Sequence, residues 1–281
     1  MFIRLGYDIE FETTAEVPTV TLLHVHPSRK KDLREPDELQ TDPILNLEDF
    51  EDTFGNRSCR LVLPSGKVRF HSSTLIKDSG EPDPQGFDAS AIPIERLPFD
   101  VLLYLTNSRY CEVDLLSNTA YELFGNTLRG WPAVRAVCDW VHSKVTFGYH
   151  FASPARTALG VYTERVGVCR DFQHLAITFC RALNIPARYA TGYLGDIGVP
   201  ISPDPMDFSA WFEVYLGDRW WTCDARHNAP RIGRVLMATG RDATDCAITT
   251  SFGRAKLLKF QVISDEVKED EAPQGLAPTG T

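Results

Sequence analysis

The hexapeptide Gly-Val-Cys-Arg-Asp-Phe at positions 167 to 172 places a cysteine where a glycine-containing turn runs into a helix-forming segment. Beyond the cysteine, apolar residues recur every three or four positions, which is the spacing of one buried helix face. They are Phe172, Leu175, Ala176, Phe179, Cys180 and Leu183. Asn184 and Pro186 then end the helix. The sequence therefore predicts an amphipathic helix from Phe172 to Leu183, with Cys169 in or just before its first turn.

Cys169 lies where a helix start favours a thiolate. Unpaired backbone N–H groups and the positive end of the helix dipole stabilise negative charge there, and the same N–H groups can hold an oxyanion. The competing interpretation is a small buried apolar residue, because free cysteine is among the most buried residue types. The charged neighbours Arg170 and Asp171 indicate a turn near solvent, which favours a reactive cysteine.

The segments around and after Cys169 resemble the transglutaminase-like family. Gly-Val-Cys-Arg-Asp-Phe-Gln-His-Leu at 167 to 175, with Cys-Arg-Ala-Leu-Asn-Ile-Pro-Ala-Arg-Tyr-Ala-Thr-Gly-Tyr at 180 to 193, is similar to the family's nucleophile helix and following strand. The resemblance continues through Ser-Ala-Trp-Phe-Glu-Val-Tyr-Leu at 209 to 216 and Trp-Thr-Cys-Asp-Ala-Arg-His-Asn at 221 to 228. It implies a papain-like fold, in which the cysteine helix packs on a sheet, and thiol chemistry on amide bonds.

The resemblance carries over the family's nucleophile and orienting acid, but not its histidine. Cys169 matches the nucleophile, and Asp224 matches the acid that fixes the tautomer of the base. The histidine position holds Ser209, and serine does not accept a proton near neutral pH. Either another residue supplies the base, or the chain has lost catalysis.

His227 is the alternative base. It follows Asp224 by three residues, just past a predicted strand, where a turn would bring its ring back toward the site. The competing interpretation is a loop histidine that bonds to neighbouring backbone, since only geometry identifies a general base. His174 is excluded as a direct partner, because five positions after Cys169 it points about 140° away and is expected on the polar helix face.

Trp211 and Arg170 are the candidate substrate-binding residues. Trp211 shares one strand face with Ser209 and Glu213, which makes this face the expected cleft wall. A core role for Trp211 fits the pattern equally well. Arg170 is expected beside the nucleophile.

Residues 1–95 are predicted to form an antiparallel β-sandwich, with an interdomain linker from about residue 77. Ile3 to Phe11 alternates apolar and polar residues, the period of a half-buried strand. Thr19 to His26 is a second strand, and the turn at 64 to 67 joins two flanking apolar runs as a hairpin. This half also resembles the amino-terminal β domain of bacterial transglutaminase-like proteins.

Residues 96–264 are predicted to form the catalytic core, and residues 265–281 a disordered acidic tail. Helices precede strands in the core, which indicates an α+β fold. The predicted helices start at Trp131 and span Thr157 to Arg165 and Phe172 to Leu183; the strands are Ala187–Leu194, Phe208–Leu216, Arg219–Ala225 and Lys256–Ile263.

Composition narrows the classes of function. The chain has 281 residues and a net charge of −9, which argues against a basic face for nucleic acid. It shows neither a secretory signal pattern nor an apolar run of membrane-spanning length, so we expect a cytoplasmic protein without membrane partners. Its 7 cysteines lack paired spacing and are expected to be reduced thiols.

His24 and His26 raise the question of a metal site, since residues two apart on a strand share a face. No third ligand lies nearby in sequence, and zinc takes three or four. We therefore expect two ordinary half-exposed strand histidines and no metal.

The sequence thus predicts a thiol enzyme that attacks the carboxamide of a protein or peptide substrate through a Cys169 acyl-enzyme. The chemistry implied by the family needs no metal or organic cofactor, and the acceptor of the acyl group is either water or an amine. The alternative is a binding protein of the same fold that has lost catalysis together with the histidine.

Overall fold

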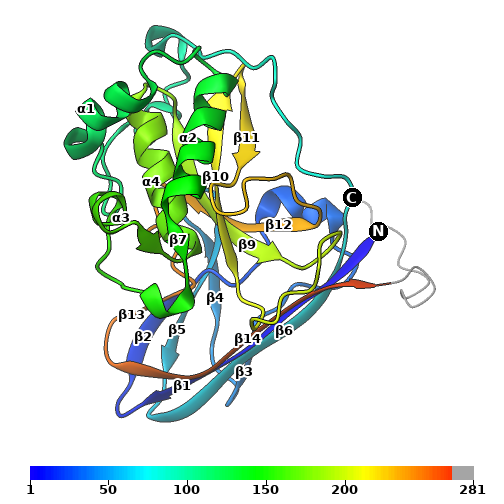
Figure 1. Ribbon diagram of the computed structural model, residues 1–281. Helices are drawn as coiled ribbons and strands as arrows, with labels where there is room; N and C mark the ends of the chain where they lie inside the picture. The colour runs from blue at the N-terminus through cyan, green and yellow to red at the C-terminus, as the bar shows by residue number, and fades with distance from the viewer. Residues whose placement is uncertain (268–281) are drawn as a thin grey trace.

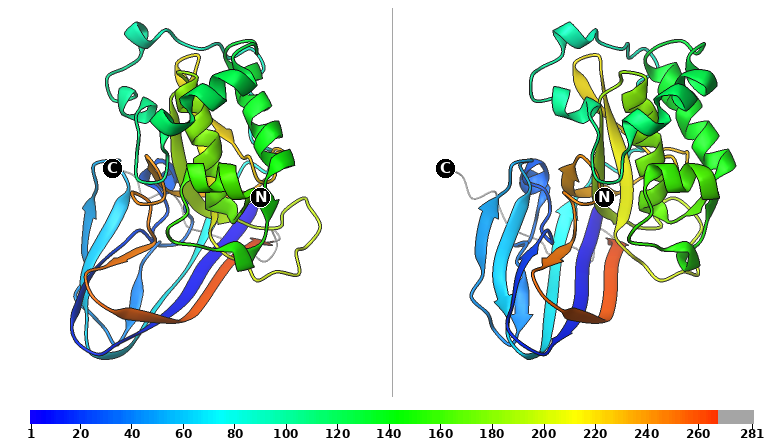
Figure 2. Two further views of the ribbon diagram at one scale, coloured as in Figure 1. Left: turned by 60° about the vertical axis from the view of Figure 1, so that its left-hand side comes forward. Right: turned by 90° about the vertical axis from the view of Figure 1, so that its left-hand side faces the viewer.

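Two four-stranded antiparallel sheets form a β-sandwich at one end of the molecule (Figures 1 and 2). The computed structural model describes residues 1–267. The strand order is β14-β1-β6-β3 in one sheet and β13-β2-β5-β4 in the other. The strands are β1 (Phe2–Thr13), β2 (Val17–Thr21), β3 (Gln40–Asp42), β4 (Glu48–Glu51), β5 (Arg57–Leu63), β6 (Gly66–Lys77), β13 (Thr249–Ser251) and β14 (Ala255–Val267). The predicted antiparallel sandwich is confirmed.

The long strand β1 shows why the sequence forms this sheet. Its apolar residues Ile3, Leu5 and Ile9 are fully buried between the sheets. The intervening polar residues face outward, where Asp8 pairs with Arg69 of β6 at 2.8 Å. A single alternating strand therefore supplies both a core face and a solvated face.

β5 and β6 are strands, as predicted, but the predicted hairpin between them is wrong. β5 pairs with β2 and β4, whereas β6 pairs with β1 and β3. The turn after Leu63 therefore carries the chain from one sheet to the other. Leu61 and Phe70 meet in the shared core from opposite sheets. Two alternating runs around a turn look alike in a hairpin and in such a corner, because both bury every second residue.

The strand predicted at Lys256–Ile263 lies within β14, but its placement in the second domain is wrong. β14 pairs with β1 from Ala255 opposite Thr13 to Val267 opposite Phe2. It belongs to the sandwich because β1 accepts a partner on each edge, and sequence patterns do not reveal pairing across so many residues. Residues 265–267 continue this strand, and the rest of the predicted disordered tail, 268–281, lies outside the described residues. The interdomain boundary between Lys77 and Pro98 stays a prediction.

The predicted strand Thr19–His26 is shorter than expected, and its histidines do not share a face. β2 ends at Thr21, and the 3-10 helix η1 (Pro27–Asp32) follows. His24 is only 2% exposed and lies 3.5 Å from the Asp37 carboxylate, so it is not half-exposed. His26 instead accepts a hydrogen bond from the Ser28 N–H at the start of η1. Within residues 1–267, no group of three or more metal-binding side chains is placed to hold an ion.

The second unit is an antiparallel sheet, ordered β11-β10-β9-β12, with helices on one face and the sandwich on the other (Figures 1 and 2). Its strands are β9 (Ala187–Leu194), β10 (Ser209–Leu216), β11 (Arg219–Cys223) and β12 (Arg234–Gly240). Its helices are η2 (Ile94–Arg96), η3 (Leu102–Leu105), α1 (Val113–Phe124), α2 (Trp131–Lys144), η4 (Tyr149–Phe151), α3 (Ala158–Glu164) and α4 (Cys169–Ala182), and the short parallel pair β7 (Thr146–Phe147) and β8 (Val166–Gly167) precedes α4. None of the helices described is long and apolar enough to cross a membrane.

α4 is the central helix of this unit. It contacts α1, α2, α3 and β10, and every residue from Asp171 to Ala182 is buried. The sequence predicted a helix with one buried face and one polar face, whereas in the structure both faces are buried. Buried polar residues on the helix are paired, as when the Arg181 Nε donates to the Ala187 carbonyl at 2.9 Å. The helix that begins at Cys169 is thus held on all sides.

Candidate active site

Cys169 is positioned by a tight connection between β8 and α4. The Asp171 carboxylate accepts a hydrogen bond from the Val168 N–H at 2.9 Å, and Asp171 is completely buried with Arg156 at 3.6 Å. A Cβ on Gly167 would lie 2.6 Å from the Asp171 side chain, which explains the glycine before the cysteine. Asp171 was expected near solvent because it is charged. It is instead buried and fixes the start of the helix through its bond to the Val168 N–H.

The Cys169 thiol is packed among protein groups, although the residue keeps partial exposure. Burial raises the pKa of the thiol to about 11, while the Arg226 guanidinium and the backbone N–H groups of Ala210 and Arg170 act to lower it. Nearby Asp207 raises it further. The expectation that the helix start favours a thiolate is therefore outweighed by desolvation.

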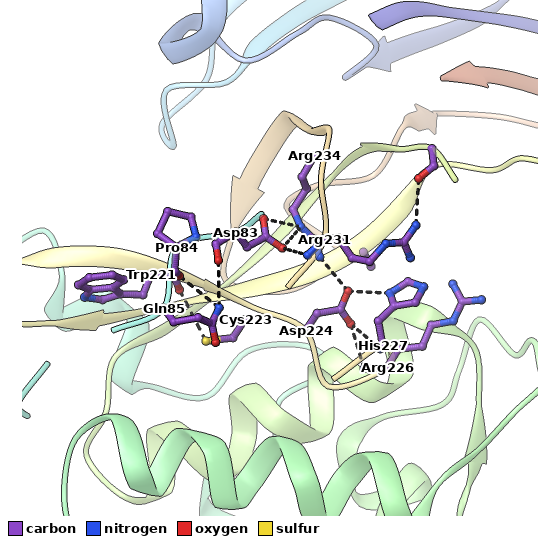
Figure 3. A network of polar contacts seen from close by, with 12 residues as sticks. Asp83, Pro84, Gln85, Trp221, Cys223, Asp224, Arg226, His227, Arg231 and Arg234 are labelled. Carbon is purple, nitrogen blue, oxygen red and sulfur yellow. Dashed lines mark hydrogen bonds and ion pairs between the residues drawn. The ribbon is translucent and has the colours of Figure 1, made fainter. Parts of the chain in front are cut away.

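Asp224 and His227 form a hydrogen-bonded pair in the turn after β11 (Figure 3). The His227 Nδ1 lies 2.8 Å from the Asp224 Oδ2, and the Asp224 Oδ1 accepts the backbone N–H groups of Arg226 and His227 at 2.9 and 3.1 Å. Burial opposes ionisation of Asp224, but the bond from His227 and the charge of Arg234 hold the pKa of the carboxyl well below its ordinary value. Asp224 is therefore an ionised acceptor that orients the ring.

Gln173 ties α4 to this turn. Its side-chain amide nitrogen donates to the Ala210 carbonyl at 3.2 Å and to the Asp224 Oδ1 at 3.0 Å, and its oxygen accepts the Ala225 N–H at 3.1 Å. The sequence interpretation missed Gln173. The signal was present, because a residue four positions after Cys169 lies on the same side of the helix.

Arg234 extends the pair into a longer network (Figure 3). Its Nη2 donates to the Asp224 Oδ2 at 3.2 Å, and its Nε donates to both Asp83 oxygens at 3.2 and 3.1 Å. Asp83 lies in the predicted linker and also accepts the Arg231 N–H at 3.0 Å. The linker is therefore anchored to the site at this point, which its composition did not indicate.

Trp211 is buried beneath this network and lines neither cavity beside Cys169. It is 2% exposed, and the Arg234 guanidinium lies 4.8 Å from the ring centroid. The alternative of a core role thus describes its position, because the ring packs closely against Gly192 of β9 and the Arg234 guanidinium lies over it. Arg170, in contrast, lines one cavity and lies over the Tyr110 ring at 5.4 Å.

Ser209 occupies the first position of β10, opposite Gly192 of β9. Its hydroxyl is buried, and among the described residues it has no hydrogen-bond partner.

His174 is also buried rather than on a polar face: its ring stacks on Tyr110, and its Nε2 accepts the Ala243 N–H at 3.2 Å. Burial lowers the pKa of His174 to about 3, so this ring is neutral and stays excluded as a partner.

Two cavities meet at Cys169. The first, of about 400 Å³, also contains His227, Arg226 and Ser209 in its wall. The second, of about 640 Å³, is lined by Arg170 and by residues of β13 and β14. The structure therefore brings Cys169, Ser209 and His227 to one cavity, with Asp224 behind His227. Within residues 1–267, no direct hydrogen bond joins the His227 ring to the sulfur.

Comparison with known proteins places this site in a family. The model of the transglutaminase-like superfamily core matches residues 118–225. The solved structure of a candidate cysteine protease from Cytophaga hutchinsonii is 30% identical, covers 99% of this chain and 95% of that chain, and has a TM-score of 0.82. An uncharacterized protein of Mycobacterium leprae is 29% identical over 118 residues, which are 41% of this chain and 42% of that protein, so the match spans less than half of this relative. With the cysteine at the head of the central helix and the aspartate at the end of the facing sheet, the chain belongs to the transglutaminase-like superfamily.

Proposed function

We propose that this protein is a thiol enzyme that acts on carboxamide groups of protein or peptide substrates. Cys169 is the nucleophile, His227 the general base and Asp224 the residue that orients the base. The observation that supports this most is the Asp224–His227 hydrogen bond of 2.8 Å, made by a ring in the wall of the cavity that contains Cys169. Ser209 occupies the position at which the family has its histidine. In this chain the general base is instead His227, in the turn after β11.

The roles follow from the protonation states. Asp224 engages the Nδ1 of His227, so a proton on Nδ1 leaves the Nε2 free to accept one. Because burial keeps the Cys169 thiol protonated at neutral pH, a base has to take the proton as the bond forms. His227 is 23% exposed on its side chain, which leaves room for the ring to reach the sulfur directly or through one water.

The reaction then has two halves. In the first, the sulfur bonds to the carboxamide carbon, the C–N bond breaks, and ammonia or an amine leaves with the proton held by His227. In the second, water or an amine attacks the thioester carbon and gives a proton to His227, the C–S bond breaks, and His227 returns the proton to the sulfur as the acid or new amide is released. Hydrolysis and acyl transfer differ only in the acceptor, which depends on how well the cleft excludes water.

Turnover of a substrate tests this function, because alkylation at neutral pH would report only the burial of the protonated thiol. Ammonia release from glutamine-containing casein should occur with the wild type and disappear in Cys169→Ala, and an added primary amine tests for transfer. No ammonia release and no amine transfer by the folded wild type would contradict the enzyme.

The second candidate function is a binding protein that uses the same cleft without turnover. The raised pKa of Cys169 and the unpartnered hydroxyl of Ser209 favour it. Binding of peptides without ammonia release or cleavage would support this candidate over the enzyme.

The proposed compartment is the cytoplasm. All 7 cysteines lie in the described part of the chain, and each is a free thiol. Reduced cysteines are typical of cytosolic proteins.

A further inference from the structure

The two cavities beside Cys169 form one cleft that continues past the nucleophile in both directions. Five residues line both of them: Tyr149, Cys169, Asp207, Phe208 and Ser209. A site for a small molecule buries most of its ligand in one pocket. A cleft with space on both sides of the sulfur instead suits a chain that extends beyond the attacked group in both directions.

The two arms of the cleft differ in chemistry. We call the cavity of about 400 Å³ the polar arm, because Asp196, Asp204 and Arg231 stand in its wall. We call the cavity of about 640 Å³ the apolar arm. Its charged residues are Arg170 and Asp207, and the wall beyond them is built from small and apolar side chains that include Pro154, Ala243, Ala247, Ile248 and Phe260.

The β-sandwich supplies the far wall of the apolar arm. Ile248 precedes β13, Thr250 lies in β13 and Phe260 lies in β14, and these strands pair with β2 and β1. Phe260 packs edge-on against Phe208 at 5.7 Å between ring centroids. Its side chain is nevertheless 38% exposed, so a large apolar surface remains open toward the cleft.

Resting on the proposed function, we infer that the apolar arm is a subsite for an apolar side chain of an extended polypeptide substrate, and that Phe260 of the β-sandwich recognises this side chain. The bound segment is continuous with the attacked carboxamide at Cys169, which is why the arm opens at the nucleophile. Recognition comes from removing the two apolar surfaces from water. The sandwich is thus part of the substrate site, and the core alone does not determine selectivity.

The experiment uses peptides with one central glutamine, in which leucine or serine is placed in turn at each of the neighbouring positions. Equilibrium binding is measured on Cys169→Ala by fluorescence anisotropy, and turnover on the intact enzyme by ammonia release and mass spectrometry. We expect leucine at one position on one side of the glutamine to bind about tenfold tighter than serine. Phe260→Ala should abolish this preference and leave binding of the serine peptide unchanged.

Leu258→Ala is the matched control, because Leu258 lies on the same strand with the same 38% exposure and does not line the cleft. Thr250→Glu is a second variant that removes no packing, since Thr250 is exposed and the new charge enters the apolar arm. It should weaken the leucine peptide as Phe260→Ala does. Thermal unfolding reports whether either variant is misfolded.

The outcomes distinguish a failure of the proposed subsite from a failure of the proposed enzymatic function. A Phe260-dependent leucine preference in binding, without turnover by the intact protein, would sustain the subsite and reject the proposed function. Turnover with no leucine preference, or with a preference that survives both Phe260→Ala and Thr250→Glu, would overturn the subsite and leave the enzyme standing. Equal losses in Leu258→Ala would also overturn it.

Discussion

The start of β10 and the turn after β11, which contains Asp224, offer Cys169 very different chemistry. Ser209 is fixed by strand pairing with Gly192 and is buried, but it carries no group that titrates near neutral pH. His227 lies on a turn, is partly exposed, and has its ring held by one bond to Asp224. The strand provides precise placement without a base, whereas the turn provides a base with more freedom.

This difference shows that the Asp224 carboxylate, rather than strand β10, is common to the two possible positions of the base. Gln173 reaches both the Ala210 carbonyl and the Asp224 carboxylate, so Asp224 lies close to the start of β10 as well as to His227. An imidazole at position 209 or at position 227 would therefore find the same orienter. We expect the two positions to be alternatives, and the following changes test this view.

The largest expected effect comes from Cys169→Ala, because both arrangements of the base act on the same sulfur. Loss of the nucleophile should lower kcat at least about a thousandfold. Cys59→Ala is the control, since that thiol is buried in the core of the sandwich and lines neither cavity beside Cys169. Steady-state ammonia release measures both, and comparable activity in the two variants would remove Cys169 from the reaction.

His227→Gln tests whether the turn after β11, rather than the start of β10, provides the general base. General bases contribute about 10²–10⁴-fold, so kcat/KM should fall within this range. Adding Ser209→His to this variant should restore part of the loss if the two positions are alternatives. His71→Gln, on the outside of the sandwich, serves as the control. Full activity in His227→Gln would show that the turn does not provide the base.

Ser209→His alone should change the pH dependence of alkylation. In the native protein burial raises the pKa of Cys169 to about 11, so the alkylation rate should still be rising above pH 9, because only the thiolate reacts. An imidazolium at 209 favours the charged form of sulfur, and papain-like pairs reach about 3 to 4. The midpoint should therefore move down by several units.

Rate against pH, with Cys169→Ser as the blank, measures this midpoint. The helix start was expected to favour a thiolate at Cys169, and the burial of the sulfur outweighs that effect on its pKa. An unchanged midpoint in a folded Ser209→His variant would mean that position 209 does not face the sulfur.

Asp83→Asn is expected to have the smallest effect, because it acts through Arg234. With Asp83 neutral, Arg234 keeps Asp224 as its one charged partner within residues 1–267 and competes with His227 for the Oδ2. We expect a several-fold fall in kcat/KM, a shift of its pH profile, and about 1–3 kcal/mol of lost stability.

Asp83→Glu should restore the pH profile, which a purely structural role would not require. Asp88→Asn, exposed on the same segment, is the control. A profile identical to the wild type would confine Asp83 to structure.

The sequence allowed local features to be predicted better than distant pairings. The helix after Cys169 and the strands around Trp211 follow from periodicity and are confirmed. The partner of β1 in β14 and the corner after Leu63 could not be predicted, since alternation does not identify a partner strand. A pattern of residues indicates which face is buried but not what covers it.

The same limit applies to the site. Cys169 and Asp224 were identified from the resemblance to the family, and His227 from its position three residues after Asp224. The structure places Cys169 and His227 in the wall of one cavity, with Asp224 bonded to His227 behind it. Gln173, Arg234 and Asp83 were missed, because their roles depend on contacts between segments far apart in the chain. The thiol pKa was misjudged for a related reason, since a helix dipole is a local property and desolvation is a property of the whole fold.

The pairing of β14 with β1 also has a consequence for the order of events during translation. β1 is synthesised before the second unit, but the strand that covers one of its edges follows only after that entire unit. Until then that edge presents unpaired backbone groups to any extended chain nearby. The sandwich is therefore completed after the unit that follows it in sequence, and a nascent chain stalled before Ala255 would be prone to mispairing.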